Sequence, residues 1–249
     1  MKITLKSIWK QFKYDLIIFF REPFFALPIL LLPGLFFVVY AGSMANSYDN
    51  IDIFAQYIPM YMILISFLTV FFNIGTQYVT DKESGIFKRL LLSPISIYNL
   101  VLTYALRGLV ISILGFFEMI GIAVFVFKIP LSDHMVVYFF TYIVIVMIMM
   151  LISLSLHGFF NNARQVMPFT IIGFQYVLFA SGMIMPVENM PVVLRYLVYV
   201  NPVYHMNLIL IRVWFGMEQK MVNIAALAAC VIICFVLLRV QKGFSTDRS

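Results

Sequence analysis

The stretch Asp81–Tyr98, DKESGIFKRLLLSPISIY, carries five charges in its first nine residues and separates two long apolar runs. A helix in this stretch would carry on one face the apolar side chains of Ile86, Phe87, Leu90 and Leu91. Lys88 and Arg89 would project elsewhere. We expect this amphipathic connector to lie at a membrane surface, either as a basic anchoring turn or as a contact site for a soluble protein.

The composition of the chain explains why this connector stands out. Hydrophobic residues make up 63% of the 249 residues and charged residues only 11%, and the mean hydropathy is +1.00. A single soluble core of this size cannot bury so much apolar surface. We therefore predict an all-α, polytopic protein of the cell's inner or plasma membrane.

Six apolar segments are long enough to cross the hydrocarbon, which takes about 20 helical residues. We predict spans at residues 23–43, 54–80, 99–127, 135–160, 166–187 and 221–239, in a single transmembrane domain covering residues 1–249. The third span contains two charged residues, Arg107 and Glu118. Residues 81–98 then form the loop between the second and third spans.

Lys and Arg are distributed unevenly over the predicted loops. With both chain ends inside, twelve of these residues fall on the inner side and four on the outer side, and cytoplasmic loops of membrane proteins are enriched in Lys and Arg. We therefore expect both termini in the cytoplasm. The basic residues follow one leaflet and form no recognition module, so we expect membrane lipids, and no nucleic acid, as their partners.

Residues 1–22 have the pattern of a helix lying along the inner leaflet. One helical stripe holds Leu5, Trp9, Phe12 and Leu16, and a second holds Lys2, Lys6, Lys10 and Lys13. Such a helix places its lysines near lipid phosphates and its Trp at headgroup depth. It serves as an anchor in the simpler interpretation, and also touches a cytoplasmic partner in the other.

Residues 188–216 are apolar enough to suggest a seventh span. Arg195 and the Asn201-Pro202 break argue against a crossing, and a seventh span would put the basic C-terminal segment outside. We predict instead a re-entrant hairpin of two short helices on the outer side, broken at Asn201-Pro202. Irregular backbone at membrane depth must be buried in protein or line a wet cavity, so this hairpin would close the outer end of the domain.

Charged side chains inside spans are costly and indicate function. Arg107 lies near the inner end of its span, where it either snorkels to the surface or acts within the domain. Glu118 is nearer mid-membrane and requires a partner, a water-filled path or a proton. Its candidate partners are His157, Arg195 and Arg212. For His157 itself, a hydrogen-bonded packing role is the preferred interpretation.

The sequence gives little support to an enzyme or a metal site. Cys230 and Cys234 lie one helical turn apart in an apolar run, and the histidines show no metal-ligand spacing. Neither a nucleophile with its base nor an acidic cluster falls within the spans. The phosphate-binding pattern G-x-x-x-x-G-K-[ST] does not occur. We predict no catalytic, cofactor-binding or metal-binding residues, so an ATP-driven mechanism would need a separate subunit.

Four segments, in this order, resemble permease subunits of type-2 ATP-binding-cassette (ABC) exporters. They are the inner-leaflet helix, Arg21-Glu22-Pro23 with the proline-bearing first span, DKESGIFKRLLLSPIS, and NPVYHMNLILIR at residues 201–212. The resemblance covers essentially the whole chain. It implies six spans per subunit, a homo- or heterodimer of permease subunits, and two cytoplasmic ATP-binding subunits that hold ATP and Mg²⁺.

The resemblance also implies roles for particular residues. In that family an acidic-Gly-basic connector followed by Ser-Pro forms the coupling helix that docks on the ATPase. Carried over here, this gives an ATPase-coupling interface of Asp81, Glu83, Gly85, Lys88, Arg89 and Pro94. For the translocation pathway or its gates, the resemblance gives Asn201, Pro202 and Arg212. Arg107 and Glu118 join them because they are charged residues within a span.

The expected activity is export of an amphipathic or lipid-like substrate, such as a drug, peptide or lipid. The tyrosine-rich, Trp-bearing entry to the first span found in the polysaccharide-exporting branch is missing after Arg21, which disfavours a long glycan. A polysaccharide or glycolipid exporter remains one alternative. A secondary transporter or channel with a buried Glu118 is another, although the two halves of the chain show no internal repeat.

Overall fold

The computed structural model describes residues 5–21, 23–45, 51–91, 97–182 and 187–246, and within these ranges the chain is helical with no β-strand. The first part contains α1 (Leu5–Arg21), α2 (Pro23–Ala45), α3 (Ile51–Phe67), the π-helical segment η1 (Leu68–Gly75), α4 (Thr76–Glu83) and α5 (Ile86–Leu91). The middle contains α6 (Ile97–Gly121), the π-helical segment η2 (Ile122–Val126), α7 (Met135–His157) and α8 (Ala163–Phe179). The last part contains the 3₁₀ segment η3 (Val187–Asn189), α9 (Val192–Val200), α10 (Pro202–Trp214) and α11 (Met221–Thr246).

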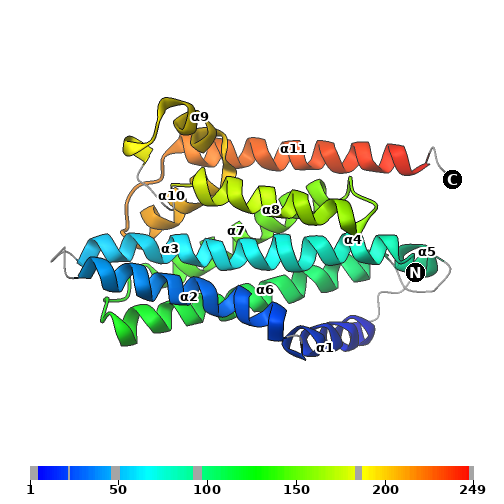
Figure 1. The fold of residues 1–249 in the computed structure, drawn as a ribbon, viewed down its shortest axis with the longest axis horizontal. Helices are drawn as coiled ribbons and strands as arrows, with labels where there is room; N and C mark the ends of the chain where they lie inside the picture. Colours follow the sequence, from blue (N-terminus) through cyan, green and yellow to red (C-terminus); the bar gives the residue numbers. More distant parts are fainter. Residues whose placement is uncertain (1–4, 22, 46–50, 92–96, 183–186, 247–249) are drawn as a thin grey trace.

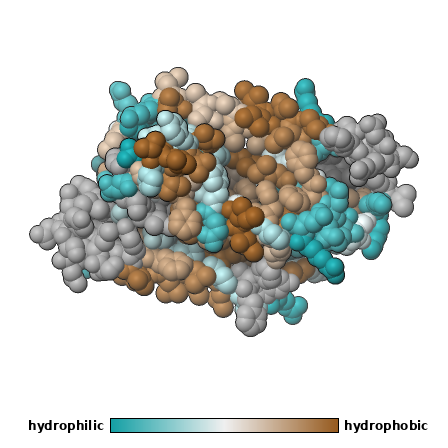
Figure 2. Space-filling view, turned by 45° about the horizontal axis from the view of Figure 1, so that its top comes forward, coloured by the Kyte–Doolittle hydropathy of each residue, from teal (hydrophilic) through white to brown (hydrophobic). Residues whose placement is uncertain are grey.

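The long helices run side by side along the molecule (Figure 1). The start of α1, the end of α11 and α5 lie at one end of this bundle, and α9 lies at the opposite end. Hydrophobic side chains dominate the middle of the face shown in Figure 2, and hydrophilic ones gather towards its two ends. This distribution matches a protein whose middle faces lipid and whose ends face water.

By length and apolar composition, four continuous helical stretches in the described ranges can cross a membrane. They are Ala55–Glu83, Asn99–Val126, Met135–His157 and Met221–Gln241. The pair α1 and α2, bent by 66°, would add a fifth if it formed one span. These stretches correspond to the predicted spans 54–80, 99–127, 135–160 and 221–239. Helix α8, which overlaps the predicted fifth span 166–187, has 17 residues and is about 25 Å long, shorter than the hydrocarbon is thick.

The continuous helix α3–η1–α4 forms the centre of the bundle. Of the most apolar 18-residue segment of this helix, 72% is buried inside the bundle. The corresponding share for α11, at the periphery, is 17%. Several buried hydroxyls in and around it bond to protein atoms, as a dry environment favours. Ser66 donates to the Met62 carbonyl at 3.0 Å and Thr69 to the Ile65 carbonyl at 2.8 Å. The Tyr142 hydroxyl of α7 lies 2.6 Å from the Ser66 hydroxyl and so ties α7 to this central helix.

His157 is fully buried at the end of α7. Its Nδ1 lies 2.8 Å from the Ser153 carbonyl oxygen, and its Nε2 lies 3.3 Å from the Thr170 hydroxyl of α8. The prediction of a hydrogen-bonded packing residue is confirmed. The contact with Thr170 makes it one of the links between α7 and α8.

The chain breaks at Asn201-Pro202 between two short helices, as the sequence predicts. Asn201 caps α10, because its Oδ1 accepts a hydrogen bond from the Val203 amide at 3.0 Å. Pro202 occupies the first helical position, where its missing N–H costs nothing. The Asn201 Nδ2 also donates to the Ala180 carbonyl at 2.7 Å, which joins α10 to the segment after α8.

Helix α1 is amphipathic, but the residues of the predicted apolar stripe do not all face the same way. Phe12 and Phe19 are buried, whereas Trp9 is 65% exposed and its ring lies 5.6 Å from that of Phe12. Lys10 and Lys13 are exposed. The helix therefore buries Phe12 and Phe19 and leaves Trp9, Lys10 and Lys13 outside.

Candidate functional site

The candidate site is the end of α4 together with the elements that hold it. Helix α4 ends at Glu83, and its terminal carbonyls are used by the Ser84 amide, bonded to Thr80 O at 2.9 Å, and by the Gly85 amide, bonded to Lys82 O at 3.3 Å. Gly85 has φ = +76°, a conformation that a residue without Cβ adopts at little cost. The chain then turns into α5. Pro94, also predicted for this site, lies outside the described residues.

Asp81 faces the interior of the bundle. It is 8% exposed, and its Oδ2 accepts a hydrogen bond from the Tyr104 hydroxyl of α6. Its Oδ1 accepts another from Gln77 Nε2 at 2.7 Å. The Arg107 guanidinium carbon lies 5.7 Å from the centre of the Tyr104 ring. Asp81 therefore ties the end of α4 to α6 from within the bundle.

Lys82 and Glu83, the next two residues, contact the loop between α7 and α8. Lys82 Nζ donates to the carbonyl oxygens of Gly158 at 2.8 Å and Phe160 at 3.1 Å. Glu83 Oε2 accepts a hydrogen bond from the Ala163 amide at 2.8 Å. Glu83, predicted as a direct contact for an ATPase, thus has a partner inside the chain. Lys82 is a site residue that the sequence prediction missed, because its partners are distant backbone atoms.

Helix α5 has one face on the bundle and another in solvent. Ile86, Phe87 and Leu90 pack against the core, and the Phe87 ring meets the Tyr78 ring edge-on at 5.3 Å. Lys88 and Arg89 are exposed, and Arg89 Nη2 donates to the Ser84 carbonyl at 3.1 Å. Helix α5 therefore presents a short basic surface, Lys88 and Arg89, while its apolar side chains hold it against the bundle.

The residues predicted for the translocation pathway lie in separate neighbourhoods. Arg107, predicted either to snorkel or to act within the domain, is 6% exposed and belongs to the Asp81–Tyr104 cluster. Glu118 is half-buried against α2, where a Cβ built on Gly34 would lie 2.7 Å from its Oε1. Arg212 Nη1 donates to the Glu218 carbonyl at 2.6 Å, in the segment that follows α10. The structure therefore brings Arg107 to the α4 site but not Glu118, Asn201, Pro202 or Arg212.

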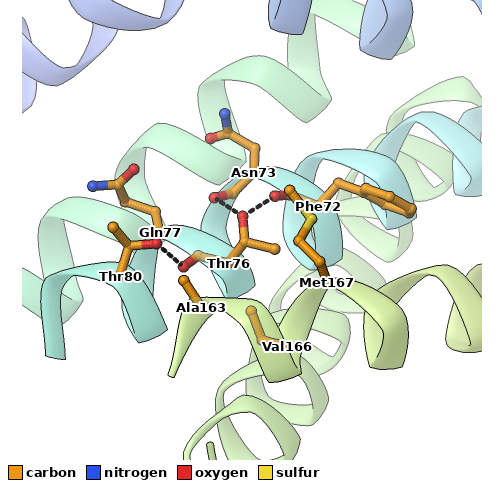
Figure 3. A pocket seen from close by; sticks show the side chains of 8 residues that line it. All are labelled: Phe72, Asn73, Thr76, Gln77, Thr80, Ala163, Val166 and Met167. Atoms are coloured by element: carbon orange, nitrogen blue, oxygen red, sulfur yellow. Dashed lines mark hydrogen bonds between the residues drawn. The ribbon is translucent and has the colours of Figure 1, made fainter. Parts of the chain in front are cut away.

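A pocket of about 190 Å³ opens beside the α4 site and was not predicted. Figure 3 shows its walls, with η1 and α4 on one side and the start of α8 on the other. The pocket is lined by Phe72, Asn73, Thr76, Gln77, Thr80, Ala163, Val166 and Met167. The Thr80 hydroxyl donates to the Thr76 carbonyl at 3.0 Å. The sequence signal for this wall is the polar run Thr76–Thr80 between the apolar run and the charged connector.

Within the described ranges, no three His, Cys, Asp or Glu side chains are grouped so that they could hold a metal ion. Cys230 and Cys234 are free thiols on α11. The α4 site offers hydrogen bonding and charge recognition by Lys88, Arg89 and their neighbours.

The family model described as ABC-2 type transporter matches residues 6–215. Two curated relatives, both named "Probable multidrug ABC transporter permease YbhR", come from Escherichia coli K12 and Escherichia coli O157:H7. Each is 22% identical over 156 residues, which is 63% of this chain and 42% of the relative. The chain belongs to the ABC-2 type transporter family and is a membrane permease of the type-2 ABC class.

Proposed function

We propose that this permease is driven by a separate ATP-binding subunit that docks on α5 and the adjacent end of α4, and that it exports an amphipathic or lipid-like substrate. The observation that carries the proposal is the construction of α5. Its apolar side chains Ile86, Phe87 and Leu90 are seated on the bundle, while Lys88 and Arg89 face outward. A displacement of α5 by a partner would therefore be passed to the bundle rather than absorbed by a loose loop.

The partner would supply ATP and Mg²⁺, and two copies of it would serve a dimer of permease subunits. For the chain itself we propose six spans, with α2 and α8 completing the four continuous ones. Helix α1 would lie along the inner leaflet, and α9 and α10 would form a re-entrant hairpin on the outer side. The start of α1 and the end of α11 share one end of the bundle with α5, which supports placing both termini in the cytoplasm (Figure 1).

The substrate class is supported by composition and by the relatives. The described surface carries many exposed large hydrophobic side chains, and the two relatives are named as multidrug permeases. We place the outer gate at the Asn201-Pro202 break and Arg212. Arg107, in the buried cluster behind Asp81, and Glu118, the half-buried acid on α6, would act along the route between the two ends.

The proposal is tested by purifying the tagged permease from its native source in mild detergent. A subunit with a P-loop sequence should copurify and be identified by mass spectrometry. Reconstituted in inverted vesicles, the complex should take up a lipophilic cationic dye or a fluorescent phospholipid only when ATP is supplied. The two probes separate drug-like from lipid cargo. Transport by the permease alone on an ion gradient would contradict the proposal and favour a secondary transporter.

The docking surface is tested by the double substitution Lys88→Glu and Arg89→Glu. Both side chains are exposed, so the variant should fold normally and lose the ATP-binding subunit. Lys220→Glu is the matched control, because Lys220 is an exposed lysine that precedes α11 at the opposite end. Retention of the subunit by the double variant would place the docking surface elsewhere.

A further inference from the structure

The α4 site contains a contact between three helices that the proposed docking does not itself require. Lys82 Nζ binds the carbonyl oxygens of Gly158 and Phe160, just beyond the end of α7. Glu83 Oε2 binds the amide of Ala163, the first residue of α8. Two successive side chains of α4 thus hold both ends of the short α7–α8 loop.

The charges of these two residues suit the helix ends that they bind. The end of a helix exposes carbonyl oxygens and carries partial negative charge, and the start exposes amides and carries partial positive charge. The positively charged Lys82 binds carbonyl oxygens just beyond the end of α7, and the negatively charged Glu83 binds an amide at the start of α8. Exchanging the two side chains would therefore make both contacts unfavourable, which fixes the register of α4 against the loop.

Helix α8 depends on these contacts more than the other long helices do. It packs chiefly against α4 and η1, and the side chains of Ile171, Ile172, Gln175 and Tyr176 are exposed. At its outer part, the Tyr176 hydroxyl donates to the Leu197 carbonyl of α9 at 3.1 Å. Helix α8 is thus tied to α4 at its inner end and to α9 near its outer end.

The pocket between α4 and α8 lies directly beside this contact, and Ala163 is both a partner of Glu83 and part of the pocket wall (Figure 3). The hydrogen bond between Glu83 and Ala163 therefore fixes the distance between the α4 wall and the α8 wall of the pocket at this end. A movement of the end of α4 would therefore pull or push α8 instead of sliding past it.

We propose that Lys82 and Glu83 form a clamp that transmits displacement of α5 and α4 to α8, and through Tyr176 to α9, so that the pocket between α4 and α8 changes width with the docked subunit. This inference rests on the proposed function. It names positioning residues of the coupling step, and it assigns Glu83 to contact within the permease rather than to the ATPase surface.

Ala163→Pro is the sharpest test of the clamp. Proline removes the N–H that Glu83 binds, yet it is favoured at the first position of a helix. The preceding residue, Asn162, has φ = −137° and ψ = 128°, the extended conformation that a following proline requires. Ala163→Ser is the matched control, because it keeps the amide. Lys82→Met removes the other half of the clamp while keeping the length of the side chain.

The first readout uses the permease alone in nanodiscs. Loss of one net hydrogen bond should raise hydrogen exchange of amides in the first turns of α8 roughly threefold to tenfold in Ala163→Pro and in Lys82→Met. Glu83→Gln should add little in the Ala163→Pro background, because its partner is already gone. Unchanged exchange in both single variants would overturn the clamp, whatever drives the protein.

The second readout uses the complex with its ATP-binding subunit. Spin labels at Gln175 of α8 and Leu102 of α6, both exposed, are placed in a background with Cys230 and Cys234 changed to alanine. Vanadate trapping should shift the distance between the labels in wild type and Ala163→Ser. The shift should be lost in Ala163→Pro, although the subunit still copurifies. A wild-type shift in Ala163→Pro overturns the clamp, whereas a wild type that binds no ATPase overturns the proposed function.

Discussion

The His157 imidazole occupies the space beside Gly75 that any side chain at position 75 would need. A Cβ at Gly75 would lie 2.5 Å from both Cε1 and Nε2 of His157. Because Gly75 has no side chain, α7 can approach the central helix closely here. Gly75 is also the last residue of the π-helical segment η1, so this contact lies where the central helix changes from π-helical to α-helical hydrogen bonding. Segments of π-helix are often found at functional sites, and this one leads directly into α4 and the pocket.

Gly75→Ala should destabilise the permease by about 1–3 kcal/mol, the usual cost of adding a methyl group to a packed interior. Gly173→Ala on α8 is the control. Nothing lies within 4 Å of a Cβ built there, so this change should be neutral or stabilise by up to about 1 kcal/mol through helix propensity. Thermal unfolding in nanodiscs measures both. In a His157→Ala background the cost of Gly75→Ala should largely disappear, and an unchanged cost would contradict the steric explanation.

Asp81 and Tyr104 should show strong energetic coupling. The hydrogen bond from the buried Tyr104 hydroxyl to the Asp81 carboxylate has an ionised acceptor, and such bonds contribute about 1.5–3 kcal/mol. Tyr104→Phe and Asp81→Asn should each destabilise, and the double variant should cost less than the sum by about that amount. Unfolding of the four proteins in mixed micelles gives the cycle. Strict additivity would mean that the bond contributes nothing to folding.

Gly85 should tolerate side chains that accept positive φ and reject proline. Its Cβ position meets nothing within 4 Å, so Gly85→Ala should cost only the conformational penalty of about 1–2 kcal/mol. Gly85→Asn should cost less than Gly85→Ala. Gly85→Pro cannot adopt φ = +76° and loses the amide bonded to Lys82 O. Copurification of the ATP-binding subunit should survive in the Asn and Ala variants and fail in Gly85→Pro; binding by the proline variant would show that the turn does not position α5.

Asn201 performs two separable tasks at the break between α9 and α10. Asn201→Ala should lose both the α10 cap and the bond to the Ala180 carbonyl, whereas Asn201→Ser retains a capping oxygen but is too short to reach Ala180. The cap is worth about 1 kcal/mol. Hydrogen exchange should therefore rise in the first turn of α10 only in the Ala variant, and in residues 180–182 in both variants. Equal exchange in α10 for the two variants would show that the side chain does not cap the helix.

The sequence was sufficient to predict the helical class, four long apolar helices, the break at Asn201-Pro202 and the amphipathic α5. All of these depend on neighbours along the chain. Apolar length, proline and a 3.6-residue period act within a few helical turns. The buried role of His157 was also predictable, because a neutral polar ring in an apolar helix needs a hydrogen-bonding partner.

The tertiary structure decided which residues meet, because those contacts join positions 23 to 80 residues apart. Asp81 could have faced solvent, yet it is turned towards Tyr104. Glu83 could have been left without a contact inside the chain, yet it binds the amide at the start of α8. The π-helical segment and the pocket beside it depend on how α7 and α8 pack against the central helix. The local sequence pattern determines where each helix lies along the chain and which of its faces is apolar. The packing of helix ends and side chains across the bundle determines which partner each charged residue binds.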